Sequence, residues 1–212
     1  MTTSFSKDFP QCNTMTFIGQ GQVSTIPNNA TIRLGVQTVG PNLTTLQSEN
    51  AQISQAIINT LNQYGVSDIK TYQYLIEKNY IYENGTQIDN GYTVRNILEI
   101  ELNNIEQVGR VIDTAVNNGA NVVELVSFGI SNKELYYQQA LNMAVMNAIQ
   151  KSKSVAMFLG LQTDPIPIHI VENSTTPIPF MQARTFGEGS FATPIEPGQY
   201  LTNAMVTVDF IY

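Results

Sequence analysis

The chain has 212 residues and a mass of 23.5 kDa, a length that allows one large domain or two small ones. Charged residues make up 13%, against about 25% in an average protein, and 21 Asn and 17 Gln supply much of the remaining polarity. The net charge of −7 disfavours nucleic acid as a partner, because an acidic surface repels phosphate backbones. The single cysteine, Cys12, excludes an intramolecular disulfide and a cysteine-based zinc cluster.

Residues 1–14 are expected to form an N-terminal arm, and residues 15–212 the folded domain. Residues 1–13 contain no apolar run of about 7 to 15 residues, so no secretory signal peptide is expected. No stretch approaches the roughly 18 apolar residues of a membrane span. The sequence therefore predicts a cytoplasmic chain without a membrane span; the alternative is transport to the cell envelope or surface by a non-standard route.

Up to residue 130, stretches in which apolar residues alternate with polar ones are interspersed with stretches of helical spacing. Two Asn-Gly pairs, Asn84-Gly85 and Asn90-Gly91, separate two long alternating stretches and predict a β-hairpin with a loop of several residues. The order strand, helix, strand, strand, helix, strand predicts an α+β fold with a split βαβ, or ferredoxin-like, antiparallel sheet. Strands are expected at 15–21, 30–39, 69–82, 92–102 and 121–130, and helices at 44–64 and 105–117.

The rest of the chain adds a long helix and further strands to this arrangement. A capping box at residues 131–134 opens the helix, which Gly160 ends. Its small residues permit close approach to a sheet or to another helix. A strand at 165–171 and a loop at 172–200, rich in Pro, Gly and Thr, precede a final strand at 204–212. The small residues of the helix are Ala140, Ala144, Ala148 and Ala156.

Several short motifs, in this order and spacing, resemble the SIMPL-domain family, formerly known only as a domain of unknown function. The resemblance runs from about residue 15 to residue 212. The motifs are Gly19-x-Gly21-x-Val23, Pro27-Asn28-x-Ala30, Gly35-Val36, Gly91-Tyr92, Val108 with Gly119-Ala120-Asn121, Phe128-x-x-Ser131, Leu159-Gly160 and Pro194-Ile195-x-Pro197-Gly198.

The resemblance implies a domain of split βαβ character with an additional long helix. It implies no established catalytic activity and no cofactor. It also implies large ring-like or channel-like homo-oligomers among bacterial members, and links to stress tolerance and envelope functions. Most bacterial members are exported, and the chain departs from them because no export signal is visible in residues 1–13.

No residue pattern points to catalysis, a cofactor or a metal. His169 is the only histidine and lies in an expected strand, so we interpret it as structural. The Gly19-Gln20-Gly21 segment lacks the third glycine of a dinucleotide fingerprint and precedes a strand instead of a helix. Glu99 and Glu101 share one face of a strand and could serve as an acid and base pair. A solvated outer face is the preferred interpretation of these two carboxylates.

Aromatic residues are the most distinctive feature of the sequence. Tyrosines are expected to share one face of the 69–82 strand, where they either form an interface or pack against the long helix. Aromatic residues in the 172–200 loop either dock onto a neighbouring subunit or fold over their own core. Cys12 is either a free thiol or an intersubunit disulfide partner. The candidate interface residues are Cys12, Tyr72, Tyr74, Tyr80, Tyr82, Phe180, Phe186 and Phe191.

The sequence thus favours a non-enzymatic, self-assembling protein that forms a ring-like or extended homo-oligomer with a structural, envelope or stress-related role. The alternative is a monomeric or dimeric adaptor that binds a peptide or protein partner through an exposed strand edge. An enzyme that uses the carboxylates in a pocket of the oligomer is a third hypothesis, which the sequence supports least.

Overall fold

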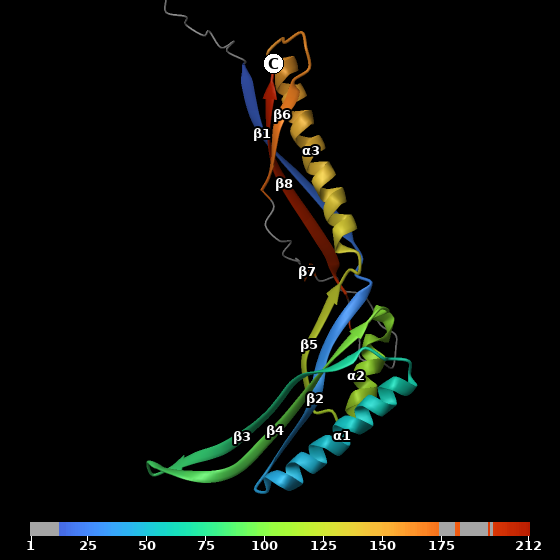
Figure 1. Cartoon of the computed structure of the whole chain (residues 1–212), viewed down its shortest axis with the longest axis vertical. Helices are drawn as coiled ribbons and strands as arrows, with labels where there is room; N and C mark the ends of the chain where they lie inside the picture. Colours follow the sequence, from blue (N-terminus) through green and yellow to red (C-terminus); the bar gives the residue numbers. More distant parts are fainter. Residues whose placement is uncertain (1–12, 174–180, 183–194, 196) are drawn as a thin grey trace, which may run out of the picture. The chain divides into compact units, whose positions relative to one another are not determined.

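A computed structural model describes residues 13–173, 181–182, 195 and 197–212 of the chain. The described chain is a mixed α+β protein with two antiparallel sheets and three α-helices, which confirms the predicted fold class. It divides into two compact units (Figure 1). The inserted unit comprises residues 26–131 and the segment from 182 to 199, and the terminal unit contains both ends of the chain. Among the described helices, none is both long enough and apolar enough to cross a membrane.

The inserted unit has the predicted split βαβ order. Its antiparallel sheet runs β3-β4-β2-β5, the ferredoxin-like arrangement. The helices lie on one face of this sheet, as Figure 1 shows. Its elements are β2 (Asn29–Gly40), α1 (Leu43–Gln63), β3 (Ile69–Glu83), β4 (Thr86–Leu102), a 3₁₀ turn (Ile105–Gln107), α2 (Val108–Asn117) and β5 (Val122–Gly129).

The core of the inserted unit lies between the sheet and its two helices. Alternate residues of β2 and β4 point toward the helices, and the apolar stripe of each helix covers them, because strand side chains alternate between faces. The α1 helix begins after Asn42, whose side chain accepts a hydrogen bond from the Thr45 amide. The helix therefore begins at Leu43, one residue before the predicted start at 44. Fully buried core residues include Ile32, Leu34, Ile57, Leu61, Leu98 and Ile100.

The two ends of the inserted unit are tied together by Asn28. The amide of Ser131 donates to Asn28 Oδ1 at 2.8 Å, and Asn28 Nδ2 donates to Ser131 Oγ at 2.9 Å. The Asn28 amide also donates to the Gly129 carbonyl. The Pro27-Asn28 and Phe128-x-x-Ser131 motifs therefore meet where the chain enters and leaves this unit.

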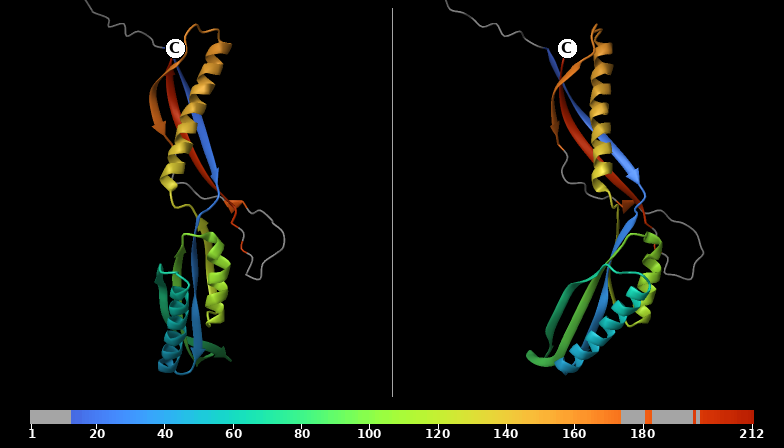
Figure 2. Two further views of the ribbon diagram at one scale, coloured as in Figure 1. Left: turned by 90° about the vertical axis from the view of Figure 1, so that its right-hand side faces the viewer. Right: turned by 45° about the vertical axis from the view of Figure 1, so that its right-hand side comes forward.

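The terminal unit is a small antiparallel sheet with one long helix on one face (Figure 2). The sheet order is β1-β8-β6, so β8 is the central strand, and the short β7 also pairs with β8. Apolar residues of β8 and alanines of α3 form its core. The elements are β1 (Thr14–Thr25), α3 (Lys133–Phe158), β6 (Ile166–Glu172), β7 (Met181–Gln182) and β8 (Gln199–Ile211).

The helix α3 lies unusually close to β1, and two glycines make this approach feasible. A Cβ atom at Gly19 would lie 2.0 Å from the Ala144 carbonyl oxygen, and one at Gly21 would lie 2.0 Å from that of Ala140. Both distances are far below van der Waals contact. The prediction that β1 ends at these glycines is wrong: β1 continues to Thr25, and its glycines are packing residues in mid-strand.

The late part of the chain differs from the expectation at its boundaries. The predicted strand at 165–171 is confirmed as β6, which extends to Glu172. The final strand begins at Gln199, five residues earlier than predicted, because Tyr200 and Thr202 already point into the core. Phe180, Phe186 and Phe191 lie outside the described residues, as does Cys12.

Candidate interaction surface

The β3–β4 hairpin is longer than predicted and has a two-residue turn. The strands continue to Glu83 and resume at Thr86, with Asn84 at φ 50° and Gly85 at φ 79°. Two consecutive positive φ angles are typical of a type I′ turn, which Asn-Gly favours. The prediction of a loop of several residues is therefore wrong. The second Asn-Gly pair lies inside β4, where Gly91 at φ 79° occupies an irregularity of the ladder.

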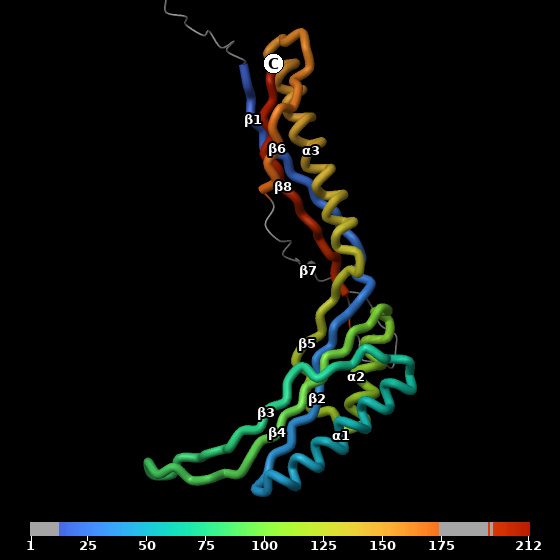
Figure 3. The backbone as a smooth tube through the Cα atoms, viewed as in Figure 1, coloured from blue at the N-terminus to red at the C-terminus, as the bar shows by residue number. Residues whose placement is uncertain are grey.

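The distal half of this hairpin is exposed on both faces. It extends beyond β2 and the two helices of its own unit (Figure 3). Every residue from Tyr80 to Asn90 is exposed, and the exposed set includes Ile81 and Ile88 as well as tyrosines. Apolar and aromatic side chains in such a position leave a surface that water does not favour.

All four predicted tyrosines are exposed, but they do not share one face. The ladder shifts between Thr71 and Gln73, so Tyr72 is an extra residue opposite β4. The Arg33 guanidinium stacks over the Tyr72 ring, with its carbon 3.7 Å from the ring centroid. This contact lies on the sheet face away from the helices. Tyr74 lies on the helix side, where Gln47 of α1 contacts its hydroxyl. The exposed fractions are 49% for Tyr72, 51% for Tyr74, 47% for Tyr80 and 72% for Tyr82.

Lys78 organises the aromatic residues at the start of the distal half. Its Nζ lies 2.7 Å from Asp89 Oδ2 and 5.6 Å and 5.8 Å from the ring centroids of Tyr80 and Tyr92. The Asp89 carboxylate, through its hydrogen bond to Lys78, raises the pKa of the ammonium, and Lys78 lowers the pKa of Asp89. Both groups are therefore charged at neutral pH, and the ammonium lies within cation–π distance of the Tyr80 ring.

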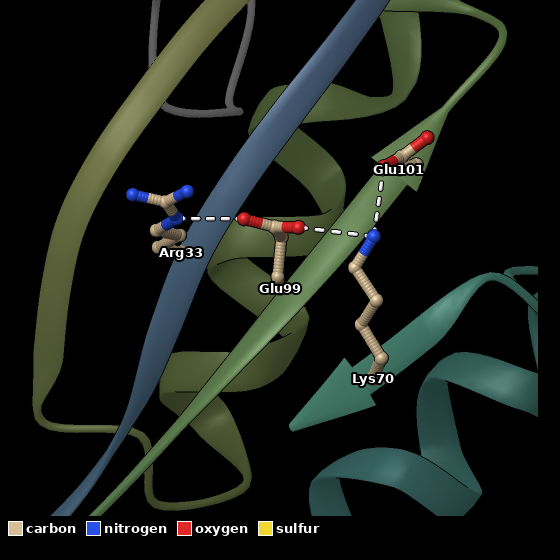
Figure 4. Close-up of polar contacts among 4 residues, drawn as sticks. All are labelled: Arg33, Lys70, Glu99 and Glu101. Atoms are coloured by element: carbon tan, nitrogen blue, oxygen red, sulfur yellow. Dashed lines mark hydrogen bonds and ion pairs between the residues drawn. The ribbon is translucent and has the colours of Figure 1, made fainter. Parts of the chain in front are cut away.

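The carboxylate Glu99 lies in an ion cluster on the sheet face away from the helices. Figure 4 shows Glu99 between Arg33 of β2 and Lys70 of β3. Arg33 Nε lies 2.7 Å from Glu99 Oε2, and Lys70 Nζ lies 3.1 Å from Glu99 Oε1 and 3.1 Å from Glu101 Oε1. Glu99 is only 9% exposed, so the prediction of a solvated outer face is wrong for this residue.

This cluster supports structure better than acid and base chemistry. The hydrogen bond from Arg33, and next that from Lys70, lower the pKa of Glu99. Both carboxylate oxygens face a cation, so Glu99 stays ionised at neutral pH and is not poised to donate a proton. Arg95, on the same strand as the two glutamates, pairs with Glu124 of β5. The cluster therefore links three strands of the sheet.

The structure brings together residues that sequence patterns alone could not identify. Arg33 and Lys70 reach Glu99 from two other strands, so only the register of the ladder reveals them. His169 lies in a strand, as predicted, and its Nδ1 lies 3.2 Å from Asp209 Oδ2. Thr16 donates to the other oxygen of Asp209 at 2.7 Å. Asp209 therefore bridges the three main strands of the terminal unit.

A recess of about 490 Å³ lies on the terminal unit and is lined mainly by amide side chains. Its lining can donate and accept hydrogen bonds. The lining residues among those described include no acid, base or nucleophile. They are Gln20, Gly21, Gln22, Asn173, Asn203, Ala204 and Met205.

The comparison with protein families gives a match that spans nearly the whole chain. The family is described as SIMPL, a protein of unknown function (DUF541), and its model matches residues 15–210. The uncharacterized protein YggE of Escherichia coli K12 is 26% identical over 150 residues, which cover 70% of this chain. That match spans 61% of the length of YggE.

A second relative matches over more of its length. The 26 kDa periplasmic immunogenic protein of Brucella melitensis is 25% identical over 209 residues, which cover 91% of this chain and 82% of the relative. Neither relative has an enzymatic name. The predicted cytoplasmic location, which rested on residues 1–13 alone, is contradicted by the periplasmic name of the Brucella protein. The motifs identified in the sequence and the match over residues 15–210 agree, and the chain belongs to the SIMPL family.

Proposed function

We propose that this protein is a non-enzymatic, self-associating protein whose distal β3–β4 hairpin is a contact surface between copies. The exposure of both faces of the hairpin from Tyr80 to Asn90 is the observation that carries the proposal. Tyrosine is enriched in protein interfaces, where it buries a large area while its hydroxyl finds a polar partner. The low share of charged residues fits this role, because charges are depleted in interface cores.

The local structure of the hairpin also supports a contact role. The Asn84-Gly85 turn and the Lys78–Asp89 ion pair hold the tyrosines on an ordered ladder. A surface that is ordered before binding loses less conformational entropy on association than a flexible loop does. Because Lys78 and Asp89 neutralise each other, neither of these two charges opposes burial of the neighbouring aromatic side chains in a contact.

We further propose that the protein acts outside the cytoplasm, with a structural or stress-related role at the cell envelope. The periplasmic name of the Brucella relative supports this location. Two observations favour a non-enzymatic role. Neither relative has an enzymatic name, and both carboxylate oxygens of Glu99 are engaged by cations.

The test is the mass of the full-length protein in solution, by light scattering coupled to size exclusion. The variant carries Tyr80→Ser with Tyr82→Ser, and the matched control carries Tyr64→Ser, an exposed tyrosine at the end of α1. We expect the hairpin variant to lose mass while the control keeps the parent mass. An unchanged mass in the hairpin variant contradicts the hairpin as a contact.

A monomeric parent would contradict self-association itself. The same exposed hairpin would then be available to a different protein, as the adaptor hypothesis requires. In that case a pull-down with the parent and with the Tyr80→Ser, Tyr82→Ser variant as paired baits would test the adaptor hypothesis directly.

A further inference from the structure

The two outer strands of the terminal sheet, β1 and β6, differ in whether their outer backbone groups are covered. An unpaired strand edge presents free N–H and C=O groups and is a template for another strand. Proteins commonly close such edges with side chains or with a covering helix. One edge of this sheet is closed in that way, whereas the other is open among the described residues.

The β1 edge is closed by side chains of α3. Lys151 Nζ donates to the Ile18 carbonyl oxygen at 2.7 Å, and Asn147 Oδ1 accepts from the Gln20 amide at 3.2 Å. Residues two apart in a strand direct their backbone groups to the same edge. The close packing of α3 on Gly21 keeps these two side chains in place. A strand that paired with β1 would have to displace both side chains.

Within the described part of the chain the β6 edge carries no side-chain cover of this kind, and the irregularity of its ladder with β8 is confined to Ile168, between Pro167 and His169. All seven residues of β6 are exposed, and among the described residues its one strand neighbour is β8. Ile166, Ile168 and Ile170 are each at least half exposed. Pro167 lacks an N–H group but is only the second residue of the strand, so Ile168 to Glu172 keep all their amides.

The open edge is also firmly held and nearly uncharged. The contact between His169 and Asp209 and the hydrogen bond from Asn173 to Thr207 fasten β6 and the residue after it to β8. The one carboxylate of β6, Glu172, accepts a hydrogen bond from the Tyr137 hydroxyl. An ordered, apolar and almost neutral edge is suited to pairing with a strand of the same character.

We propose that β6 pairs antiparallel with β6 of a second copy of this chain, about a two-fold axis, and joins the sheets of the two terminal units into one. This inference rests on the proposed self-association but concerns a surface other than the hairpin. Because β1 is closed, head-to-tail addition of β6 to β1 is blocked, and pairing stops at two copies.

The charges of β6 agree with this arrangement. A two-fold axis at His169 sets Ile168 opposite the second copy's Ile170, and Glu172 opposite the second copy's Ile166. No two carboxylates of β6 then face each other. With the hairpin as a second contact on each copy, such pairs can join into larger assemblies.

The experiment uses full-length variants with charges on the β6 edge. The first carries Ile168→Lys with Ile170→Lys, and the second carries Ile168→Glu with Ile170→Glu. Each should lose the β6 contact, because like charges then face each other across the strands. We expect the solution mass of each variant to fall at least two-fold. An equimolar mixture should recover the parent mass, because lysines then face glutamates.

The control is Met143→Lys with Met146→Lys, which places the same charges on the exposed face of α3. It should keep the parent mass, and thermal melts of all variants should show that they fold. Unchanged masses in both β6 variants, or no recovery in the mixture, overturn the β6 proposal.

The same measurements separate this proposal from the proposed function. If the β6 variants keep their mass while the Tyr80→Ser, Tyr82→Ser variant dissociates, the hairpin contact stands and β6 pairing falls. If the β6 variants lose mass while the Tyr80→Ser, Tyr82→Ser variant keeps it, β6 pairing stands and the hairpin contact falls. A monomeric parent overturns both.

Discussion

Asn28 and Ser131, which are 103 positions apart in the chain, exchange two hydrogen bonds: the Ser131 amide donates to Asn28 Oδ1 and Asn28 Nδ2 donates to Ser131 Oγ. The side chain of Asn28 thus acts as a piece of backbone that continues the pairing of β2 with β5 past Asn29 and Gly129. This pair of hydrogen bonds is a physical reason for the asparagine directly after Pro27 and for the serine three residues after Phe128.

Replacement of Asn28 by alanine should therefore destabilise the inserted unit. The change leaves the Ser131 amide without its acceptor, and we expect the free energy of unfolding to fall by about 1–3 kcal/mol. Urea denaturation followed by circular dichroism measures this loss. Ser131→Ala is the comparison, because it removes one hydrogen bond and leaves the amide bonded. An equal loss in the two variants would contradict the assignment.

Gly21→Ala should be among the most damaging small substitutions in the terminal unit. The added methyl would meet the Ala140 carbonyl oxygen, which is backbone and cannot rotate away. We expect a loss of about 3 kcal/mol, at the upper end of overpacking effects. Gln22→Ala, on the exposed face of the same strand, should cost less than about 1 kcal/mol. Thermal melts of the two variants would reveal the difference, and similar melting temperatures would contradict the close packing of α3.

The sequence predicted the elements whose signals are local, and it failed where distant segments decide the structure. Alternation and Asn-Gly predicted β3 and β4, and helical spacing predicted α1, because these patterns repeat within a few residues. A capping box and Gly160 predicted the two ends of α3. The role of Gly21 depends on α3, more than a hundred residues away, so the sequence predicts a strand end where the structure has mid-strand glycines. The sequence signal for this close packing is the row of alanines at 140, 144 and 148, because small residues permit close approach of a helix.

The candidate surface was predictable in part for the same reason. The exposure of the hairpin tyrosines is visible in the structure, but the sequence could not place Tyr72, because one inserted residue in β3 changes which face the next side chain occupies. The cluster at Glu99 was missed because its two cations come from other strands. Their approach is set by register, which alternation alone does not fix.

The stability of the inserted unit should depend on pH through Glu99. Arg33 and Lys70 lower the folded-state pKa of Glu99, so its contribution is present above the unfolded pKa of about 4.3 and is lost as pH falls through the lower folded pKa. Glu99→Gln should reduce the free energy of unfolding at pH 7, and the difference from the parent should shrink below about pH 4. Urea unfolding at several pH values measures it.

The exposed Glu101 provides a control for that experiment. Its carboxylate pairs with Lys70 at the surface, so Glu101→Gln should change stability less than Glu99→Gln does at pH 7. A Glu99→Gln variant whose stability differs from the parent by the same amount at pH 3 and pH 7 would show that the ion cluster does not contribute through charge.

The turn at the tip of the hairpin should help to keep the contact surface ordered. Gly85→Ala places a side chain at φ 79°, which costs about 1–2 kcal/mol in a left-handed conformation. Hydrogen exchange followed by mass spectrometry should show faster exchange in peptides that cover residues 80–90. Asn84→Gly keeps a turn-compatible residue and should change exchange less. Unaltered exchange in Gly85→Ala would contradict the type I′ turn.

The measurement that tests self-association most directly is sedimentation of the unmodified full-length protein over a wide range of concentrations, with and without reductant. We expect species larger than the 23.5 kDa chain, with a fraction that rises with concentration. If these species persist in reductant, then Cys12 is not needed for them and the noncovalent contacts suffice. A single 23.5 kDa species at every concentration, in both conditions, would contradict the proposal that this protein works as an assembly of its own copies.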